Sequence, residues 1–403
     1  MLTVADARAR ITKTMERTTS IEVSVSDVFG RVLAEELKSR RTQPPFDVSA
    51  MDGYAVCARD ISSVPVTLQV VGTAHAGGSY SEILNSGEAV RIFTGAPVPM
   101  GADTIVIQED TTAADDSVII KGIEPERHIR SAGLDFSEGD ILLEPGKLLT
   151  ARDAGLIAAM NIPWVMVRQR PRVGILSTGD EIVMPGDKLG PNQIVSANST
   201  GLAAAVRAFG GDPVLLGIAP DNRETLSRIA EGAKGIDLLV TTGGASVGDH
   251  DLIQEVLGGI GLDVDFWKIA MRPGKPLIFG NFSGTPLLGL PGNPVSTMVC
   301  ALIFLKPAIE AQLGLQTSDG SLETVKVTEA LRKNGKREDY IRGRLNKNKN
   351  GVMQVTPFPI QDSSMMLSLA RSDCFIVRKP LAPGVSAGTS VEILRMPSIL
   401  AGF

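Results

Sequence analysis

The stretch "TTGGASVGDHD", residues 241–251, combines residue types that could bind a phosphate group and a metal ion. Glycine lets the backbone approach a phosphate closely, so that amide N–H groups and hydroxyls can bind the anion. No lysine follows these glycines, so the stretch is not a Walker A motif, and its spacing is not that of a dinucleotide-binding motif. The stretch predicts a phosphate-binding loop formed by Gly243, Gly244, Ser246 and Gly248.

Carboxylates lie at the end of this loop and after other predicted strands. Asp249 and Asp251 precede the next predicted helix, and Asp221 follows the strand "DPVLLGIAP". A carboxylate cannot bind phosphate directly, but Mg²⁺ bridges carboxylate and phosphate oxygens. We therefore expect a Mg²⁺ site, or one for a similar divalent cation, at these three residues. Taken alone, Asp221 could equally be a helix N-cap, and Glu181 in "STGDE" is better explained by a turn.

Basic residues follow in the stretch "FWKIAMRPGKP", residues 266–276. Lys268, Arg272 and Lys275 bracket a Pro-Gly turn in apolar surroundings. A solvated charged face is the simpler explanation, but cations on a rigid turn suit a small oxyanion. The stretch "LPGNPVS" has two prolines and opens a long predicted helix, whose first N–H groups are free.

The elements that position these loops form an α/β domain predicted over residues 172–318. Buried-strand runs such as "RVGILST" alternate with helical stretches such as "ANSTGLAAAVRAFGG", which is typical of a doubly wound parallel sheet. Ligands bind beyond the carboxyl ends of the strands in such sheets. The acidic and basic loops are therefore expected to meet at one sheet edge, where they would bind a Mg-nucleotide or pyrophosphate beside a second anion.

The remaining residues predict three further domains. Helices are expected over residues 3–16 and 27–37, and short β-rich runs begin near residue 46 and end near residue 134. Five strands are predicted after residue 318. The first helix could instead pack on the α/β domain. The predicted domains are a discontinuous connecting domain (1–40 and 135–171), a β-rich insertion (41–134), the α/β domain (172–318) and a C-terminal β domain resembling a barrel (319–403).

Composition excludes several classes of protein. The net charge of −5 over 403 residues argues against a surface that binds nucleic acid. Three histidines and three widely spaced cysteines argue against a zinc site. The N-terminal stretch has no apolar core of a signal peptide, and no window reaches the length that a membrane span requires. We therefore expect a cytoplasmic protein that binds neither nucleic acid nor membrane.

The stretch "SAMDGYAV", residues 49–56, leaves two interpretations open. Asp52-Gly53 between apolar runs is typical of a hairpin turn, because both residues tolerate positive φ. The Asp52 carboxylate could also take part in chemistry. Local sequence alone favours the turn.

Six stretches together resemble a known family. "SAMDGYAV", "RIFTGAPVPMGADTIV", "GILSTGDE", "TTGGASVGDHD", "WKIAMRPGKP" and "GLPGNPVS" are similar, in this order, to the MoeA and gephyrin E-domain family of molybdenum-insertion enzymes. The resemblance implies an elongated homodimer whose α/β domain is similar to the molybdopterin-binding MogA fold. It also implies that molybdate is inserted into adenylylated molybdopterin, with Mg²⁺-dependent release of AMP.

The resemblance also implies roles for individual residues. Ser364 could replace Ser363 as the functional serine, and Arg272 stands where the family usually has lysine. Asp135 matches a further acidic position of the family. The implied catalytic residues are Asp52, Thr94, Glu181, Lys268 and Lys275, and the implied substrate or molybdate ligands are Arg272, Lys275, Pro276, Pro291, Pro294, Ser296, Arg342 and Ser363.

Two other functions remain open at this point. The α/β domain also resembles a molybdopterin adenylyltransferase, although that enzyme is a single compact domain. A non-catalytic scaffold similar to the gephyrin E domain is the second alternative, although a scaffold need not keep the acidic and basic loops. Preference for tungstate over molybdate is not decided. The adenylyltransferase and recipient molybdoenzymes are possible partners.

Overall fold

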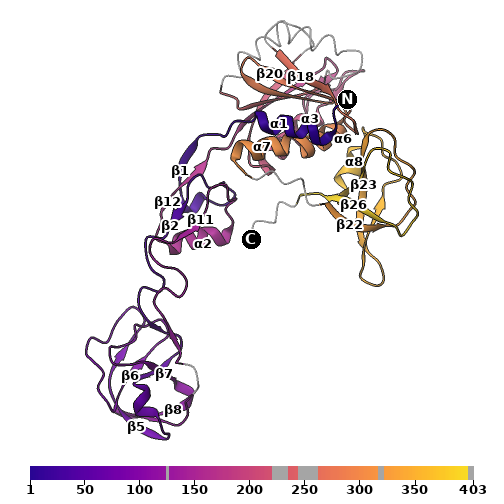
Figure 1. Ribbon diagram of the computed structural model, residues 1–403. Coiled ribbons are helices and arrows are strands. Elements are labelled where there is room, and N and C mark those ends of the chain that lie inside the picture. The colour runs from indigo at the N-terminus through magenta and orange to yellow at the C-terminus, as the bar shows by residue number, and fades with distance from the viewer. Residues whose placement is uncertain (124–126, 220–234, 244–261, 316–321, 398–403) are drawn as a thin grey trace.

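The computed structural model describes residues 1–123, 127–219, 235–243, 262–315 and 322–397. Together they form an elongated molecule (Figure 1). An α/β region carries the N-terminus, and a β-rich region lies at the opposite end of the molecule. A small connecting region joins the two, and the C-terminal β region lies beside the α/β region. The domain boundaries given above stay predictions.

A six-stranded sheet in the order β16-β13-β17-β21-β20-β18 forms the centre of the α/β region. The first four strands pair in parallel, as the alternation of strands and helices predicted. β13 is buried at every position after Arg172, as expected for a central strand. The strands are β13 (Arg172–Thr178), β16 (Asp212–Ala219), β17 (Leu238–Thr242), β18 (Leu262–Lys268), β20 (Pro276–Phe282) and β21 (Thr285–Leu290).

Two antiparallel strands extend this sheet at one edge, where the sequence analysis assigned only a loop. β20 pairs antiparallel with both β18 and β21. The reversal between β20 and β21 takes place at Ser283 and Gly284, whose φ angles of 49° and 92° suit a tight hairpin turn. Lys268 therefore ends a strand instead of belonging to an open loop.

Helices α3 (Ala197–Ala208) and α6 to α7 pack on the sheet. α6 (Pro294–Cys300), a π-helical segment (Ala301–Leu305) and α7 (Lys306–Leu313) form one helix of 20 residues. It is long and apolar enough to cross a membrane, so the expectation that no segment reaches this length was wrong. The length reflects its place in the core, because 67% of its apolar window is buried inside the protein.

Helix α1 (Val4–Thr14) packs on the α/β region although it begins the chain (Figure 1). Val4, Ala7 and Ile11 lie on one helix face and join the same hydrophobic core as α6 and α7. The Thr3 hydroxyl caps the helix by accepting a hydrogen bond from Asp6 N at 3.1 Å.

The connecting region is built from paired short strands and one helix. The helix predicted over residues 27–37 is wrong. Gly30 has φ +70°, and Val32 and Leu33 form β-bridges with Leu148 and Val167, which helical backbone would not allow. The elements are β1 (Ser20–Ser24) paired with β12 (Trp164–Arg168), β2 (Leu37–Lys38) paired with β11 (Ile141–Leu143), and α2 (Ala151–Ala159).

The β-rich region at the far end contains a six-stranded sheet in the order β7-β4-β6-β5-β9-β8. Short strands β3 (Val48–Ser49) and β10 (Ile129–Arg130) pair beside it. Its strands are β4 (Gly53–Val56), β5 (Val66–Ala74), β6 (Glu88–Ile92), β7 (Thr104–Ile107), β8 (Thr111–Ala114) and β9 (Ser117–Ile120).

The hairpin predicted at Asp52-Gly53 is wrong. β3 pairs with β10, whereas β4 pairs with β6 and β7, so the strands on either side of Asp52 do not pair with each other. Position 53 requires glycine because of steric contact, and its φ angle is not positive. A Cβ atom there would lie 2.0 Å from the Val106 carbonyl oxygen, because β7 runs directly against it.

The C-terminal region is a closed five-stranded barrel, as the five predicted strands suggested. The strands follow the order β23-β24-β22-β26-β25, and β25 pairs back to β23. Helix α8 (Met366–Ala370) precedes β25. The strands are β22 (Leu322–Val327), β23 (Glu338–Lys347), β24 (Met353–Pro357), β25 (Cys374–Arg378) and β26 (Ser390–Arg395).

A short parallel pairing joins the barrel to the α/β region. β19 (Met271–Arg272) pairs with the start of β23, and Glu338 N donates to Ala270 O at 2.8 Å. The Arg272 guanidinium donates to both carboxylate oxygens of Asp339, with Nε to Oδ1 at 3.0 Å. This fork is the geometry that arginine provides and lysine cannot.

We predict that Gly53→Ala loosens β4, β6 and β7, because the added methyl must displace the β7 backbone. Overpacking of this kind costs about 1–3 kcal/mol. Hydrogen exchange of the amides in these three strands measures how far their protection falls. Gly78→Ala is the control, because its Cβ would meet nothing closer than 3.5 Å. Equal exchange in the two variants would contradict the steric explanation.

We also predict that Arg272 and Asp339 are energetically coupled across the junction. A double-mutant cycle with Arg272→Lys and Asp339→Asn, measured by thermal unfolding, should give a coupling of about 1 kcal/mol. The Arg395–Glu323 pair is the control, because it is also bidentate but lies within the barrel. Strictly additive effects of the two substitutions would show that the pair does not join the regions.

Candidate active site

Three parallel strands end at the same edge of the α/β sheet. Ser177 on β13 lies opposite Thr242 on β17, and Thr242 lies opposite Leu290 on β21. The loops that the sequence analysis selected after these strands therefore begin side by side. This edge is where a doubly wound sheet binds its ligand.

A hydrogen-bond network holds two of these loops together. Asn198, in the first turn of α3, donates from its side-chain amide to Thr242 Oγ1 at 2.9 Å and to Gly292 O at 2.7 Å. The hydroxyls of Thr242 and Thr297 both donate to Pro291 O, at 3.2 and 2.5 Å. The sequence analysis missed Asn198 because it treated "ANSTG" only as a helix start; its place after a strand end was the available signal.

Gly243 is conformationally required at this edge. Its φ is +101°, and a Cβ atom would lie 2.1 Å from Thr178 O. The buried hydroxyls of Ser177 and Thr178 have no hydrogen-bond partner among the residues that the structure describes. Buried hydroxyls usually have a hydrogen-bond partner, so these two are exceptions at this edge.

The rest of the predicted phosphate loop and the predicted metal ligands lie outside the described residues. These are Gly244, Ser246, Gly248, Asp221, Asp249 and Asp251. Within the described ranges, no group of three or more His, Cys, Asp or Glu side chains could hold a metal ion. Glu181 is exposed beside this edge, and its carboxylate lies over Gly179.

The three predicted basic residues Lys268, Arg272 and Lys275 each have different surroundings in the structure. Lys268 Nζ lies 3.3 Å from the centre of the Trp267 ring, which is a cation–π contact. The Arg272 charge is already matched by Asp339. Lys275 is half-buried and forms no ion pair within the described part of the chain. Pro276 begins β20 directly after it.

The proline-rich loop meets a loop of the barrel. Pro294 is the first residue of α6, and Ser296 is buried in its first turn. Val295 N donates to Ser363 O at 3.0 Å, so residues almost 70 positions apart in the sequence lie in contact. The structure therefore brings Pro291, Pro294, Ser296 and Ser363 together.

Arg342 is buried and forms hydrogen bonds within the barrel region, and its predicted role as a molybdate ligand stays a prediction. Its side chain is only 1% exposed. All of its N–H groups point to oxygen atoms of residues 360–368. A guanidinium has five N–H groups, and direct binding of an oxyanion would break one of these bonds.

Asp52 and Thr94 lie in contact with each other but far from this edge. Thr94 donates to Asp52 Oδ1 from its backbone N at 2.7 Å and from its hydroxyl at 2.8 Å. These two bonds, mainly the backbone one, lower the pKa of the Asp52 carboxyl. Their sheet is at the opposite end of the molecule from the α/β sheet (Figure 1), so one chain does not bring them to the loops. Asp135 is exposed in the connecting region.

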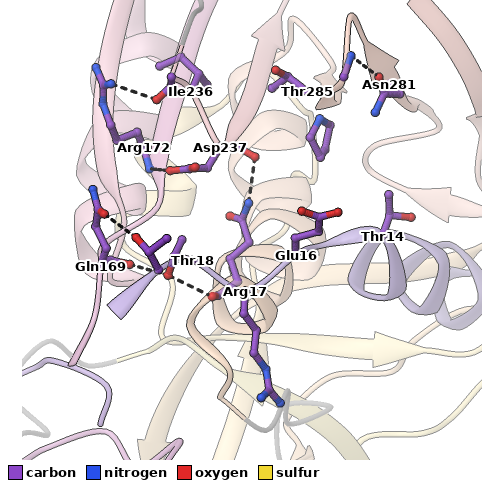
Figure 2. A pocket seen from close by; sticks show the side chains of 15 residues that line it. Thr14, Glu16, Arg17, Thr18, Gln169, Arg172, Ile236, Asp237, Asn281 and Thr285 are labelled. Atoms are coloured by element: carbon purple, nitrogen blue, oxygen red, sulfur yellow. Dashed lines mark hydrogen bonds between the residues drawn. The ribbon is translucent and has the colours of Figure 1, made fainter. Parts of the chain in front are cut away.

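A separate cavity of about 520 Å³ opens at the opposite, amino-terminal edge of the α/β sheet (Figure 2). Glu16, Thr18, Gln169, Arg172 and Asp237 are among its lining residues. None of the predicted site residues lines it. The cavity is therefore distinct from the candidate site.

Comparisons with known proteins agree over almost the whole chain. Residues 2–161 match the MoeA N-terminal region (domain I and II), residues 174–311 a probable molybdopterin binding domain, and residues 324–396 the MoeA C-terminal region (domain IV). A molybdopterin molybdenumtransferase of Haemophilus influenzae is 36% identical over 98% of both chains. One from Nostoc sp. is 36% identical over 91% of this chain and 87% of its own.

Solved structures show the same architecture. A molybdopterin biosynthesis MoeA protein from Pyrococcus horikoshii is 30% identical, covers 99% of this chain with all of its own length, and superposes with a TM-score of 0.83. A molybdenum cofactor biosynthesis protein from Pyrococcus furiosus, at 18% identity and a TM-score of 0.60, shares the fold. The chain therefore belongs to the MoeA family.

Proposed function

We propose that the chain is a molybdopterin molybdenumtransferase, which inserts molybdate into adenylylated molybdopterin and releases AMP and the molybdenum cofactor. The observation that carries this proposal is the meeting of three loops at one sheet edge. Thr242 and Gly243 lie at the end of β17, the segment from Pro291 to Ser296 lies beside Thr242, and Ser363 contacts the start of α6 from the barrel. A molybdopterin substrate accords with the names of the curated relatives.

Molybdate is a small tetrahedral dianion, and we assign its binding mainly to Lys275. Arg342 uses its N–H groups within the barrel, and Arg272 is paired with Asp339. Lys275 is partly shielded from water and has no described ion-pair partner. A half-buried ammonium interacts with an oxyanion more strongly than an exposed one, because water screens the charge less. Arg272 keeps an exposed outer edge that could assist.

Mg²⁺ is part of the proposal, although its predicted ligands lie outside the described residues. When bound, the ion would supply Lewis-acid stabilisation of charge at the phosphoanhydride. Within the described residues, the role of the chain is to position the substrate. The backbone at Gly243 would bind and orient the phosphate end of the substrate.

We further propose that the active unit is a homodimer. Asp52 and Thr94 lie at the far end of the chain from the sheet edge, so a site that needs both is incomplete in one copy. A second copy, related by twofold symmetry, would supply the missing half. An aspartate carboxyl is ionised at neutral pH, and the hydrogen bonds from Thr94 lower the pKa of Asp52, so it stays ionised to a lower pH. Its charge would be lost only as the pH falls through that lowered pKa.

The proposal also includes the cellular compartment of the enzyme and its protein partners. We propose that the enzyme acts in the cytoplasm. It would receive its substrate from an adenylyltransferase and pass its product to recipient molybdoenzymes. Neither partner is identified by the described surface.

We predict that Lys275→Ala weakens molybdate binding by about 10- to 100-fold, the range for losing one charged hydrogen-bonding partner. Molybdate titration in the AMP-release assay with adenylylated molybdopterin measures this. Lys349→Ala, at an exposed turn of the barrel, is the control. Unchanged affinity in Lys275→Ala would place the oxyanion elsewhere. Formation of adenylylated molybdopterin and pyrophosphate from ATP and molybdopterin would instead favour an adenylyltransferase.

We predict that two variants, each impaired at a molybdate concentration that saturates the wild type, recover activity when they are combined. Asp52→Ala and Lys275→Ala would damage opposite halves of a shared site. After equal amounts are mixed, unfolded and refolded together, about half of the dimers are mixed, each with one intact site of two. Roughly a quarter of the wild-type activity should return. No recovery, with dimers confirmed by light scattering, would show that one chain supplies both residues.

A further inference from the structure

We propose that Arg91 positions the Asp52 carboxylate for the reaction by tying together the three strands that surround it. The inference rests on the proposed function, in which Asp52 and Thr94 complete the site. It assigns roles to Arg91 and Gln108, neither of which is among the predicted site residues. The contacts that support it all lie within the β-rich region of one chain.

The guanidinium of Arg91 joins the ends of three strands. Arg91 lies on β6, and its Nη1 donates to Gly53 O on β4 at 2.9 Å. Its Nη2 donates to Gln108 Oε1 at 2.8 Å, one residue after β7 ends. Because β4 lies between β6 and β7 in the sheet, one planar group connects the start of β4 to the ends of its two neighbours.

Both acceptors of Arg91 adjoin the backbone of Asp52. Gly53 follows Asp52 directly in the chain, and Gln108 N donates to Asp52 O at 3.1 Å. The side chain of Asp52 is fixed separately, because Thr94 donates twice to its Oδ1. A shift of the Asp52 backbone would therefore disturb bonds that depend on Arg91.

Aromatic rings keep the Arg91 guanidinium in this position. Its Cζ lies 5.1 Å from the centre of the Tyr54 ring and 4.8 Å from that of Phe93. Tyr54 is opposite Arg91 in the pairing of β4 and β6, and Phe93 is two residues further along, so the three side chains share one face of the sheet. His75 stacks on the Phe93 ring, with 5.2 Å between the ring centres. The rings attract a cation through cation–π contacts, which a neutral side chain at position 91 would lose.

The same stack supports the residue that bonds to the carboxylate. Thr94 follows Phe93, whose ring contacts both Arg91 and His75. The two hydrogen bonds from Thr94 lower the pKa of the Asp52 carboxyl most, and the positive charge of Arg91 lowers it further. Arg91 therefore supports both the position of Asp52 and its negative charge.

The test compares Arg91→Met, Arg91→Lys and Gln108→Ala in the full-length chain. Methionine is long enough to contact the rings but has neither the charge nor the fork, whereas lysine keeps only the charge. We expect Arg91→Met to lower kcat for AMP release by about 10- to 100-fold, the range for a misplaced group in an active site. Arg91→Lys and Gln108→Ala should each have a smaller effect, because each leaves part of the arrangement in place.

Binding of molybdate should be almost unaffected by these changes. The half-saturating molybdate concentration should stay within about twofold in all three variants, because a lost positioning role lowers kcat without removing a ligand. The proposed molybdate ligand, Lys275, lies in the α/β region, away from Arg91.

Hydrogen exchange provides a readout that does not depend on activity. Thr94 N is protected by Asp52 Oδ1, and Gln108 N is protected by Asp52 O. Both amides should exchange faster in Arg91→Met, and the Thr94 amide should also exchange faster in Gln108→Ala. Combining Arg91→Met with Gln108→Ala should be no worse than Arg91→Met alone, because both changes act through the same fork.

The matched control is Arg59→Met. Arg59 is an exposed arginine of the same β-rich region, and its Nε lies 3.7 Å from a carboxylate oxygen of Asp60. Removing its charge therefore leaves the contacts of Asp52 intact. The control should show normal exchange of the two amides and a normal kcat.

Two results would overturn the inference. Unchanged exchange of both amides in Arg91→Met would show that the arginine does not hold Asp52. Weaker binding of adenylylated molybdopterin in Arg91→Met, with normal exchange and a normal kcat, would show that Arg91 binds the substrate instead. Full activity in Asp52→Ala would overturn the proposed site itself, and exchange of the Thr94 amide would still decide whether Arg91 holds the carboxylate.

Discussion

The parallel register of β13, β17 and β21 determines where three loops of the candidate site begin. Ser177, Thr242 and Leu290 are matched across the sheet, so their following loops leave from one edge. Asn198 then ties the loops after β17 and β21 by two hydrogen bonds from one amide. If this register slipped, the backbone at Gly243 and the proline-rich loop would no longer lie side by side.

The distribution of positive charge at this edge follows from how the barrel is attached. β23 carries both Asp339, which pairs with Arg272, and Arg342. The guanidinium of Arg272 joins the barrel to the α/β region, and that of Arg342 bonds to the loop that contains Ser363. The planar guanidinium suits this work, because it satisfies several fixed acceptors at once. The lysine at position 275 is left with its charge unmatched by the described residues.

The elongated shape has a direct functional consequence. The connecting region places the sheet with Asp52 and Thr94 away from the α/β sheet (Figure 1). Two hydrogen bonds from Thr94 orient the Asp52 carboxylate and lower its pKa. In the proposed homodimer, the α/β sheet edge of a second copy would lie against the Asp52 carboxylate of the first.

The sequence by itself determined the fold class, the barrel strands, the parallel part of the sheet and the family, because these depend on local periodicity and on long motifs. It also identified the glycine at position 243, whose φ of +101° only glycine adopts easily. It misassigned residues 27–37 and Asp52-Gly53, because local propensity cannot show which distant strands will pair. Tertiary structure alone decided that Gly53 is needed by the β7 backbone, that Arg342 is buried and fully bonded, and that Asn198 links two loops. A cation's role depends on the acceptors that surround it, and those acceptors come from parts of the chain that only folding brings together.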